Sequence, residues 1–240
     1  METEEKMIKT DMHIHTNGIS FCARADFQAV IDSKIATGYG GMVLTNHCQP
    51  WYYPAHENAR FMKRVVEEYR KAKSYGEMRG FRVFLGIEVT VNDPFYSDWL
   101  LYGVTEEFLL NAPCLYQLSQ KELYLLCEKH GAVLVQAHPY RSNTGYCDDM
   151  RPGELQYLHG LEINCSKGDL ERKDEVITLA GKAKKLVTCG TDYHGVAKFC
   201  GGTLLPARVQ TNEDLAEYLK TTKYTRVFLE EETLVLPTGR

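Results

Sequence analysis

Positions 7–15 have the sequence MIKTDMHIH, and this stretch gives the clearest indication of the fold and of a functional site. We predict that Met7 to Ile14 forms the first β-strand. Because successive side chains of a strand point to opposite faces, His13 and His15 point the same way, with Asp11 on their side. Two imidazoles a few ångströms apart at one strand end can hold a metal ion. The pair therefore predicts a metal site whose other ligands come from elsewhere in the chain.

Short apolar runs alternate with helical patterns through most of the remaining sequence. Further strands are expected at about 41–45, 81–87, 99–104, 132–137, 158–163 and 186–189. Helices are expected at about 26–37, 54–75, 117–130, 170–185 and 212–220, and two tail strands at 225–229 and 233–236. This alternation predicts an α/β fold with a parallel sheet covered on both faces. Seven strands are enough to close a TIM-like barrel, and an open doubly wound sheet is the alternative.

The composition is that of an ordinary globular protein, and we expect one domain over residues 1–240. The formal net charge of −4 argues against a non-specific binder of nucleic acid or membranes, since no basic excess neutralises phosphates. No secretory signal, transmembrane run or nucleotide-binding glycine motif is recognisable. Eight cysteines without C-x-x-C spacing indicate reduced thiols and a cytoplasmic protein.

Five of the expected strands are followed directly by imidazole or carboxylate side chains. These residues are His13, His15, His47, Glu88, His138, Asp192 and His194. Because the C-terminal ends of parallel strands meet on one rim, we expect the seven side chains to lie together. His56, His130 and His159 follow no strand and are expected elsewhere. The alternative is a merely structural polar cluster, since a single histidine after a strand is usually a hydrogen-bonded loop residue.

These ligand types also indicate which metals would bind. Imidazoles with carboxylates and no thiolate suit Zn²⁺, Mn²⁺ or Fe²⁺. Seven candidates exceed the three or four ligands of one catalytic zinc, so more than one divalent ion per chain is expected. Glu88 is the natural bridge, because its two oxygens can serve two metals.

The order of these motifs resembles that of the PHP superfamily, named after polymerase and histidinol phosphatase. The motifs are H-x-H at 13–15, T-N-H at 45–47, G-I-E-V at 86–89, A-H-P at 137–139 and G-T-D-x-H at 190–194. The resemblance spans residues 11–194. It implies a distorted (β/α)7 barrel that hydrolyses a phosphate mono- or diester through a metal-activated hydroxide at a two- or three-metal centre.

The resemblance also implies how the ligands are shared. One metal would be held by His13, His15, Glu88 and Asp192, a second by Glu88 and His138, and a third by His47 and His194. The chain departs from the family pattern at Ser20-Phe21, where members with three full sites have a further His or acid. It also has no histidine between Glu88 and His130, and Glu106 or Glu107 is the candidate replacement. Asn46 stands where Asp is usual.

A substrate phosphate would need fixed cations on the same rim. Arg24, Arg141 and Lys167 are the candidates, and Arg141 is preferred because its loop also carries a candidate metal ligand. His194, or alternatively His47, is the candidate proton donor to the leaving group. Glu162 and Asn164 stand at a strand end and are expected to orient the ligands from behind.

Two other functions are compatible with this ligand set. One is a metal-dependent amidohydrolase, a class that also opens with H-x-H, and the other is a degenerate metal-binding module serving a partner. The terminal D-x-H favours the phosphoesterase. The expected substrate is a small phosphorylated molecule, with nucleic acid only as a short substrate. The sequence leaves open whether it is histidinol phosphate, a nucleotide, a sugar phosphate or an oligonucleotide.

Overall fold

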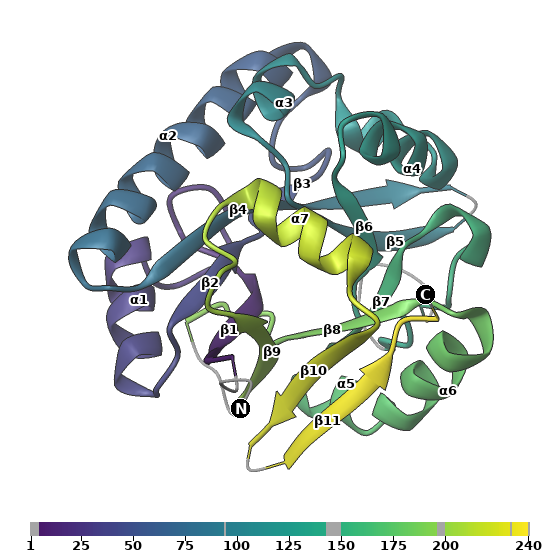
Figure 1. Ribbon diagram of the computed structural model, residues 1–240. Helices are drawn as coiled ribbons and strands as arrows, with labels where there is room; N and C mark the ends of the chain where they lie inside the picture. Colours follow the sequence, from purple (N-terminus) through teal and green to yellow (C-terminus); the bar gives the residue numbers. More distant parts are fainter. Residues whose placement is uncertain (1–4, 94, 143–149, 196–199, 231, 240) are drawn as a thin grey trace.

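The computed structural model describes residues 5–93, 95–142, 150–195, 200–230 and 232–239 (Figure 1). Its strands form one curved sheet in the order β11-β10-β9-β1-β2-β4-β5-β6-β7-β8, with β3 paired to β4. The strands are β1 Met7–Ile14, β2 Gly41–Leu44, β3 His47–Cys48, β4 Arg82–Asn92, β5 Tyr96–Tyr102, β6 Val133–Gln136, β7 Gly160–Asn164, β8 Leu186–Gly190, β9 Gly201–Pro206, β10 Tyr224–Leu229 and β11 Glu232–Pro237.

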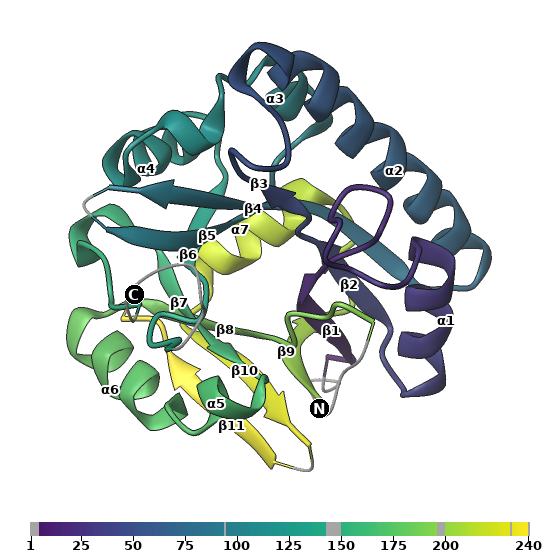
Figure 2. The same cartoon turned by 180° about the vertical axis from the view of Figure 1, so that it is seen from behind.

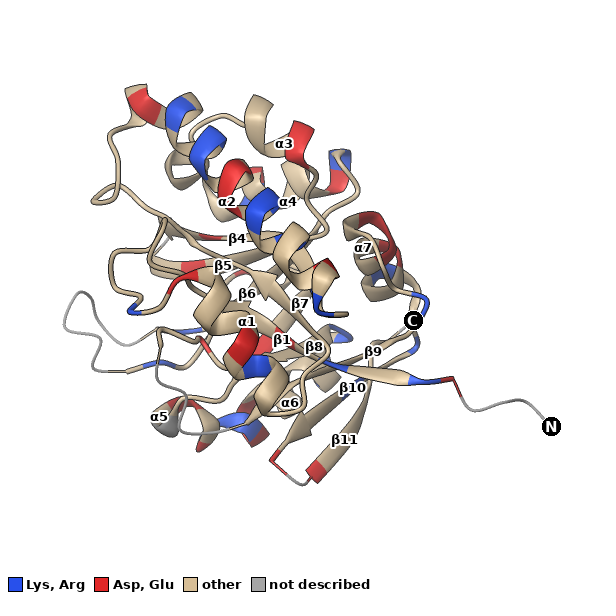
Figure 3. Ribbon diagram, turned by 90° about the vertical axis from the view of Figure 1, so that its left-hand side faces the viewer, with Lys and Arg blue, Asp and Glu red and all other residues tan. Residues whose placement is uncertain are grey.

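Helices α1 to α6 lie around the sheet, and α7 crosses one end of it (Figures 1 and 2). The helices are α1 Phe27–Ala36, α2 Asn58–Met78, α3 Glu106–Asn111, α4 Gln120–Lys129, α5 Lys167–Leu170, α6 Lys173–Ala183 and α7 Asn212–Thr221. Short 3₁₀ turns cover Ala55–Glu57, Leu115–Gln117 and Leu155–Tyr157. Charged residues of both signs lie along α2 (Figure 3), which indicates a solvated outer face. None of the described helices has the length and apolar character needed to cross a bilayer.

The sheet nearly closes on itself because the chain that follows β8 returns to β1. Tyr193 forms a parallel bridge with Ile14. Its N–H donates to the His13 carbonyl at 3.1 Å, and its own carbonyl accepts from the His15 N–H at 3.0 Å. The predicted α/β barrel is therefore confirmed, and the open-sheet alternative is wrong.

The expectation of an all-parallel sheet is wrong at β5, which runs antiparallel to both β4 and β6. The cause is the connection from β4, which spans only residues 93–95 and is too short for a crossover helix. β5 consequently begins, rather than ends, at the rim where the parallel strands end. The sequence analysis also missed β9, which pairs antiparallel with β1 and β10.

Large apolar side chains fill the barrel interior, and α7 closes one end of it. Met12, Phe84 and Leu100 belong to one buried cluster with Leu215 and Leu219 of α7. The first residue of α7, Asn212, accepts a hydrogen bond from the Leu85 N–H at 2.8 Å, near the start of β4. Because α7 covers the starts of parallel strands, the opposite end of the barrel is free for a site.

Candidate metal centre

The structure brings all seven predicted side chains together at the C-terminal ends of the parallel strands. Glu88 lies at the centre. Its Oε1 is 3.2 Å from His13 Nε2 and 3.3 Å from His138 Nε2. Its Oε2 is 2.6 Å from His47 Nδ1 and 3.5 Å from His15 Nε2. The pairing of β3 with β4, which sets His47 opposite Glu88, produces part of this arrangement.

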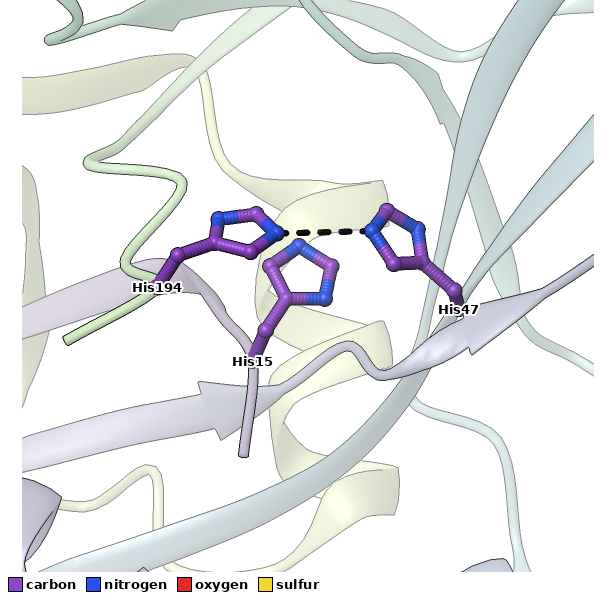
Figure 4. A group of neighbouring side chains, drawn as sticks. All are labelled: His15, His47 and His194. Atoms are coloured by element: carbon purple, nitrogen blue, oxygen red, sulfur yellow. Dashed lines mark hydrogen bonds between the residues drawn. The ribbon is translucent and has the colours of Figure 1, made fainter. Parts of the chain in front are cut away.

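Asp192 approaches the same imidazoles from the other side. Its Oδ1 is 3.1 Å from His15 Nε2 and 3.4 Å from His13 Nε2. The His194 ring comes from the same loop, and its Nε2 lies 3.4 Å from His47 Nε2. Figure 4 shows that the rings of His15, His47 and His194 converge from three separate segments.

Two of the candidate ligands have backbone conformations that are uncommon outside glycine. The φ angle is 26° at His138 and 51° at Asp192. Such positive φ values cost about 1–3 kcal/mol for a residue with a side chain, and they persist where surrounding structure requires them. Both side chains reach the centre: His138 Nε2 lies 3.3 Å from Glu88 Oε1, and Asp192 Oδ1 lies 3.1 Å from His15 Nε2.

Residues behind the cluster fix the orientation of the rings, as predicted for Glu162 and Asn164. Glu162 Oε1 lies 2.9 Å from His13 Nδ1, and its Oε2 accepts from the His138 N–H at 3.0 Å. Asn164 Nδ2 donates to the same Oε2 at 3.0 Å. Because this carboxylate occupies Nδ1, the Nε2 of His13 is the nitrogen that faces the centre.

Ser20 and Asn46, which stand at two of the departures from the family motif, take part in a supporting network. Ser20 Oγ is 3.4 Å from His15 Nδ1, accepts from the His47 N–H at 3.0 Å and donates to Asn46 Oδ1 at 2.8 Å. Asn46 also accepts from the Thr16 N–H at 2.8 Å. These two side chains therefore position two loops instead of reaching the centre.

The carboxylate that completes the cluster at His138 is Asp98, which the sequence analysis missed. Its Oδ2 is 3.9 Å from His138 Nε2, and Asp98, Glu88 and His138 form a group able to hold a metal ion. Asp98 reaches this position because β5 is antiparallel and begins at the rim. The proposed replacement by Glu106 or Glu107 is wrong: α3 starts at the far end of β5, and Glu106 pairs there with Arg70.

Asp11 of the first motif is a structural residue below the centre. Its Oδ1 accepts from the N–H groups of Thr191 at 2.9 Å and His13 at 3.1 Å, and its Oδ2 pairs with Lys34 Nζ at 2.5 Å. Both charged side chains are buried. The ion pair ties β1 to α1, and the hydrogen bond from Thr191 ties β1 to the loop that carries Asp192.

Opposite charges in the cluster control the protonation of its members. Burial disfavours the charged form of His13, but Glu162, Glu88 and Asp192 outweigh it and raise its pKa well above the usual range. Burial and the neighbouring His47 and His194 lower the pKa of His15 well below that range. Against the effect of burial, the positive imidazoles hold the pKa of Glu88 low, so it is a carboxylate at neutral pH.

Several buried nitrogen and oxygen atoms of the centre are free of hydrogen bonds to the described part of the chain and could therefore bind a metal ion. Among the described residues, the buried atoms His13 Nε2, His15 Nε2, Glu88 Oε2 and Asp192 Oδ1 lie close to one another or to neighbouring imidazoles, but none of them makes a hydrogen bond of normal geometry. Buried polar groups in folded proteins are normally satisfied, so these four atoms need another partner. In each of the triads His13–His15–Glu88, His13–His138–Asp192 and His15–His47–His194, ligand atoms lie within 4.8 Å of one another. The donor set therefore fits divalent metal ions.

The cluster forms the floor of a cavity of about 630 Å³. Arg141 lines it, but its guanidinium donates to Asp192 Oδ2 at 2.7 Å and to Asp169 at 2.6 Å. Burial notwithstanding, these two carboxylates raise the pKa of Arg141. Arg24 is exposed and is not among the residues that line the cavity. The side chain of Lys167 lies outside the described part of the structure.

The histidines expected elsewhere do lie away from the centre. His56 is exposed, His130 packs against Phe108, and His159 pairs with Glu128 at 2.9 Å. The cavity has instead an unexpected member, Cys22. Burial opposes ionisation of its thiol, but hydrogen bonds with His194 and His47 lower its pKa to about 6.

Comparison with solved structures identifies the same fold in several proteins. A two-domain protein from Bacteroides vulgatus containing a predicted PHP-like metal-dependent phosphoesterase has a TM-score of 0.63 and 18% identity, over 95% of this chain and 66% of that one. PsfC from Pseudomonas syringae has a TM-score of 0.65 and 17% identity, over 95% and 93%. The lesion-specific endonuclease Q from Pyrococcus furiosus has 0.56 and 11%, over 92% and 58%.

The chain thus spans just under two thirds of the Bacteroides protein and somewhat more than half of endonuclease Q. No protein-family model and no curated protein matches the sequence. At these identities the likeness concerns the fold, and it confirms at that level the resemblance to PHP phosphoesterases. What the centre does must be inferred from its own residues.

Proposed function

We propose that this protein is a metal-dependent phosphoesterase that hydrolyses phosphate mono- or diesters. The observation that supports this most strongly is the convergence of buried, unpartnered nitrogen and oxygen atoms on the floor of an open cavity. His13, His15, Glu88 and Asp192 would hold the innermost ion. Glu88 would share a second ion with His138 and Asp98, and His47 and His194 would hold a third. Zn²⁺, Mn²⁺ or Fe²⁺ suits these ligands.

Ions bound in this way would supply Lewis acidity towards the phosphoryl oxygens and make water more acidic. The residues of the chain have separate tasks. Arg141 holds Asp192 in place through its bond to Oδ2 and leaves Oδ1 towards the histidines. His194 has 30% of its side chain exposed in the cavity, so it can pass a proton to the leaving alcohol when a metal does not occupy it.

The test begins with protein stripped by a chelator and reloaded separately with Zn²⁺ or Mn²⁺. We expect hydrolysis of p-nitrophenyl phosphate or its bis ester only after reloading, and elemental analysis to give two or three ions per chain. His13→Ala and Asp192→Ala should each abolish hydrolysis of both esters. His159→Ala is the matched control, since it removes an imidazole that pairs with a carboxylate away from the cavity.

Activity that survives both site substitutions would contradict the proposal. Preferential hydrolysis of a cyclic amide would favour an amidohydrolase on the same fold. Tight metal binding without turnover of any ester or amide would favour the non-catalytic module.

A further inference from the structure

The cavity is larger and more apolar than a phosphate group requires. Its volume of about 630 Å³ is in the range of pockets that enclose a whole small molecule. Among the described residues, four aromatic side chains line its mouth: Phe21, Trp51, Tyr52 and Tyr96. They come from two loops and the start of β5, and none of them is a candidate metal ligand.

These aromatic side chains form two stacked pairs. Phe21 and Tyr52 have ring centroids 4.9 Å apart with planes inclined by 6°, and Trp51 and Tyr96 have centroids 5.9 Å apart with planes inclined by 5°. Tyr52 also lies 5.6 Å from the His47 ring. The aromatic surface therefore begins directly beside the outer histidines of the metal centre.

Two of the four rings are mainly exposed, although they are large and apolar. Phe21 has 67% of its surface exposed and Trp51 has 54%. Large apolar groups in water are unfavourable, and a contiguous set of them at a concave site indicates a ligand. Exposed rings beside a cavity favour a flat partner, because π-systems of bases and aryl groups stack on them.

Resting on the phosphoesterase function proposed above, we propose that the substrate is a phosphate ester whose alcohol carries a flat aromatic ring. The ring stacks on Trp51 or Phe21 at the mouth while the phosphate reaches the floor. A nucleobase and a simple aryl group share this chemistry. The net charge of −4 favours a small ester over a long nucleic acid, which would need a basic surface along its backbone.

The test compares benzyl phosphate with cyclohexylmethyl phosphate, whose leaving alcohols are similar primary alcohols and differ in ring flatness. The wild type should prefer the benzyl ester in kcat/KM by roughly 5- to 150-fold, the range that one stacked ring contributes. Trp51→Leu and Phe21→Leu keep apolar bulk and should reduce this preference towards unity, mainly by lowering kcat/KM for the benzyl ester. Tyr224→Leu, which removes a 56% exposed ring on β10, should change neither value.

Binding gives a readout that does not depend on catalysis. The chain has two tryptophans, and Trp99 is fully buried with its Nε1 bonded to Ser97. Quenching of fluorescence by adenosine monophosphate in the presence of Zn²⁺ should therefore come from Trp51 and vanish in Trp51→Leu. Ribose 5-phosphate should not quench. Quenching by benzyl phosphate alone would identify an aryl ring other than a nucleobase.

The two proposals fail in different ways. The aromatic-ring inference would be overturned if the benzyl and cyclohexylmethyl esters were hydrolysed equally well in the wild type and in both variants, and if neither adenosine monophosphate nor benzyl phosphate quenched the fluorescence. The proposed phosphoesterase function would then still stand. Quenching of Trp51 by adenosine monophosphate without hydrolysis of any ester would keep the ring site and overturn the proposed function.

Discussion

The metal centre has an inner end around His13 and an outer end around His47 and His194. Histidine side chains lie at both ends, but their surroundings differ. At the inner end His13 is fully buried, and the Glu162 carboxylate lies 2.9 Å from the Nδ1 of its ring. At the outer end His47 and His194 have 15% and 30% of their side chains exposed. The Nδ1 of His194 lies 2.9 Å from the carbonyl oxygen and 3.4 Å from Oδ1 of Asp192, a residue of its own loop.

Because of this difference, the inner end is more fully formed than the outer end before a metal binds. A ring held from behind by a buried carboxylate keeps its orientation and presents one nitrogen to the centre. A partly exposed ring on a loop loses conformational freedom when it binds. The inner end should therefore hold its ion more tightly, and the outer ion should exchange first.

The largest effect is expected when the residue shared by both ends is changed. Glu88→Gln removes the charge of the carboxylate that lies within 3.5 Å of four histidines. We expect loss of nearly all bound metal and a fall in kcat/KM of at least about 10³-fold, corresponding to several kcal/mol. His194→Gln should lose only the outer ion. Elemental analysis and kinetics of both variants check this, and equal metal loss would show that the two ends do not differ.

The inner end also depends on the ion pair beneath it. Lys34→Met would leave Asp11 buried without its 2.5 Å partner, which should lower the free energy of unfolding by about 3–5 kcal/mol. Arg79→Met is the matched control, because it breaks a half-exposed pair with Asp32 and should cost less than about 1 kcal/mol. Urea denaturation measures both. Similar losses in the two variants would mean that the buried pair has no special role.

Removing the charge of Glu162, which lies behind the His13 ring, should have a smaller effect on metal binding that is confined to the inner end. Glu162→Gln keeps the shape of the side chain but loses its charge, so metal affinity should fall by about 10- to 100-fold. Glu128→Gln, which alters the surface pair with His159, should leave affinity unchanged. Competition with a chelating dye measures the affinity. An unchanged inner ion in Glu162→Gln would show that packing alone orients the ring.

The sequence was sufficient to predict the inner end because strand geometry determines it. His13, His138 and Asp192 follow buried parallel strands, and the ends of such strands meet at one rim whatever the intervening helices do. Glu162 could be recognised for the same reason. The alternation of strands and helices predicted an α/β sheet, and the family resemblance favoured the closed barrel over the open sheet.

Asp98 could not be found in this way, because the direction of β5 depends on a three-residue connection rather than on any pattern within the strand. That connection was hidden because the predicted strands ended at 87 and resumed at 99, whereas β4 runs to Asn92 and β5 begins at Tyr96. Only a hairpin can have so short a connection. The aromatic mouth was missed for a different reason. Phe21 and Trp51 lie in loops without periodicity, and loops acquire their neighbours from the whole fold.

The smallest expected effect concerns the reactivity of Cys22 at the outer end. Burial opposes its ionisation, but hydrogen bonds with His194 and His47 lower its pKa to about 6 in the metal-free protein. The thiolate is then largely formed at pH 7, so alkylation by iodoacetamide should reach half its maximal rate near pH 6. An ordinary thiol with a pKa of about 8.5 is mostly protonated at that pH.

At pH 7 Cys22 should react roughly threefold faster than such a thiol, since the lower pKa also weakens the nucleophile. Peptide mass analysis separates its labelling from that of the other cysteines, including Cys200, the second exposed cysteine among the described residues, and Cys22→Ser provides the blank. His194→Gln removes one of the stabilising imidazoles and should move the midpoint to higher pH. A midpoint that stays near 6 in this variant would show that the outer histidines do not control the thiol, and that the two ends of the centre are less distinct than their geometry indicates.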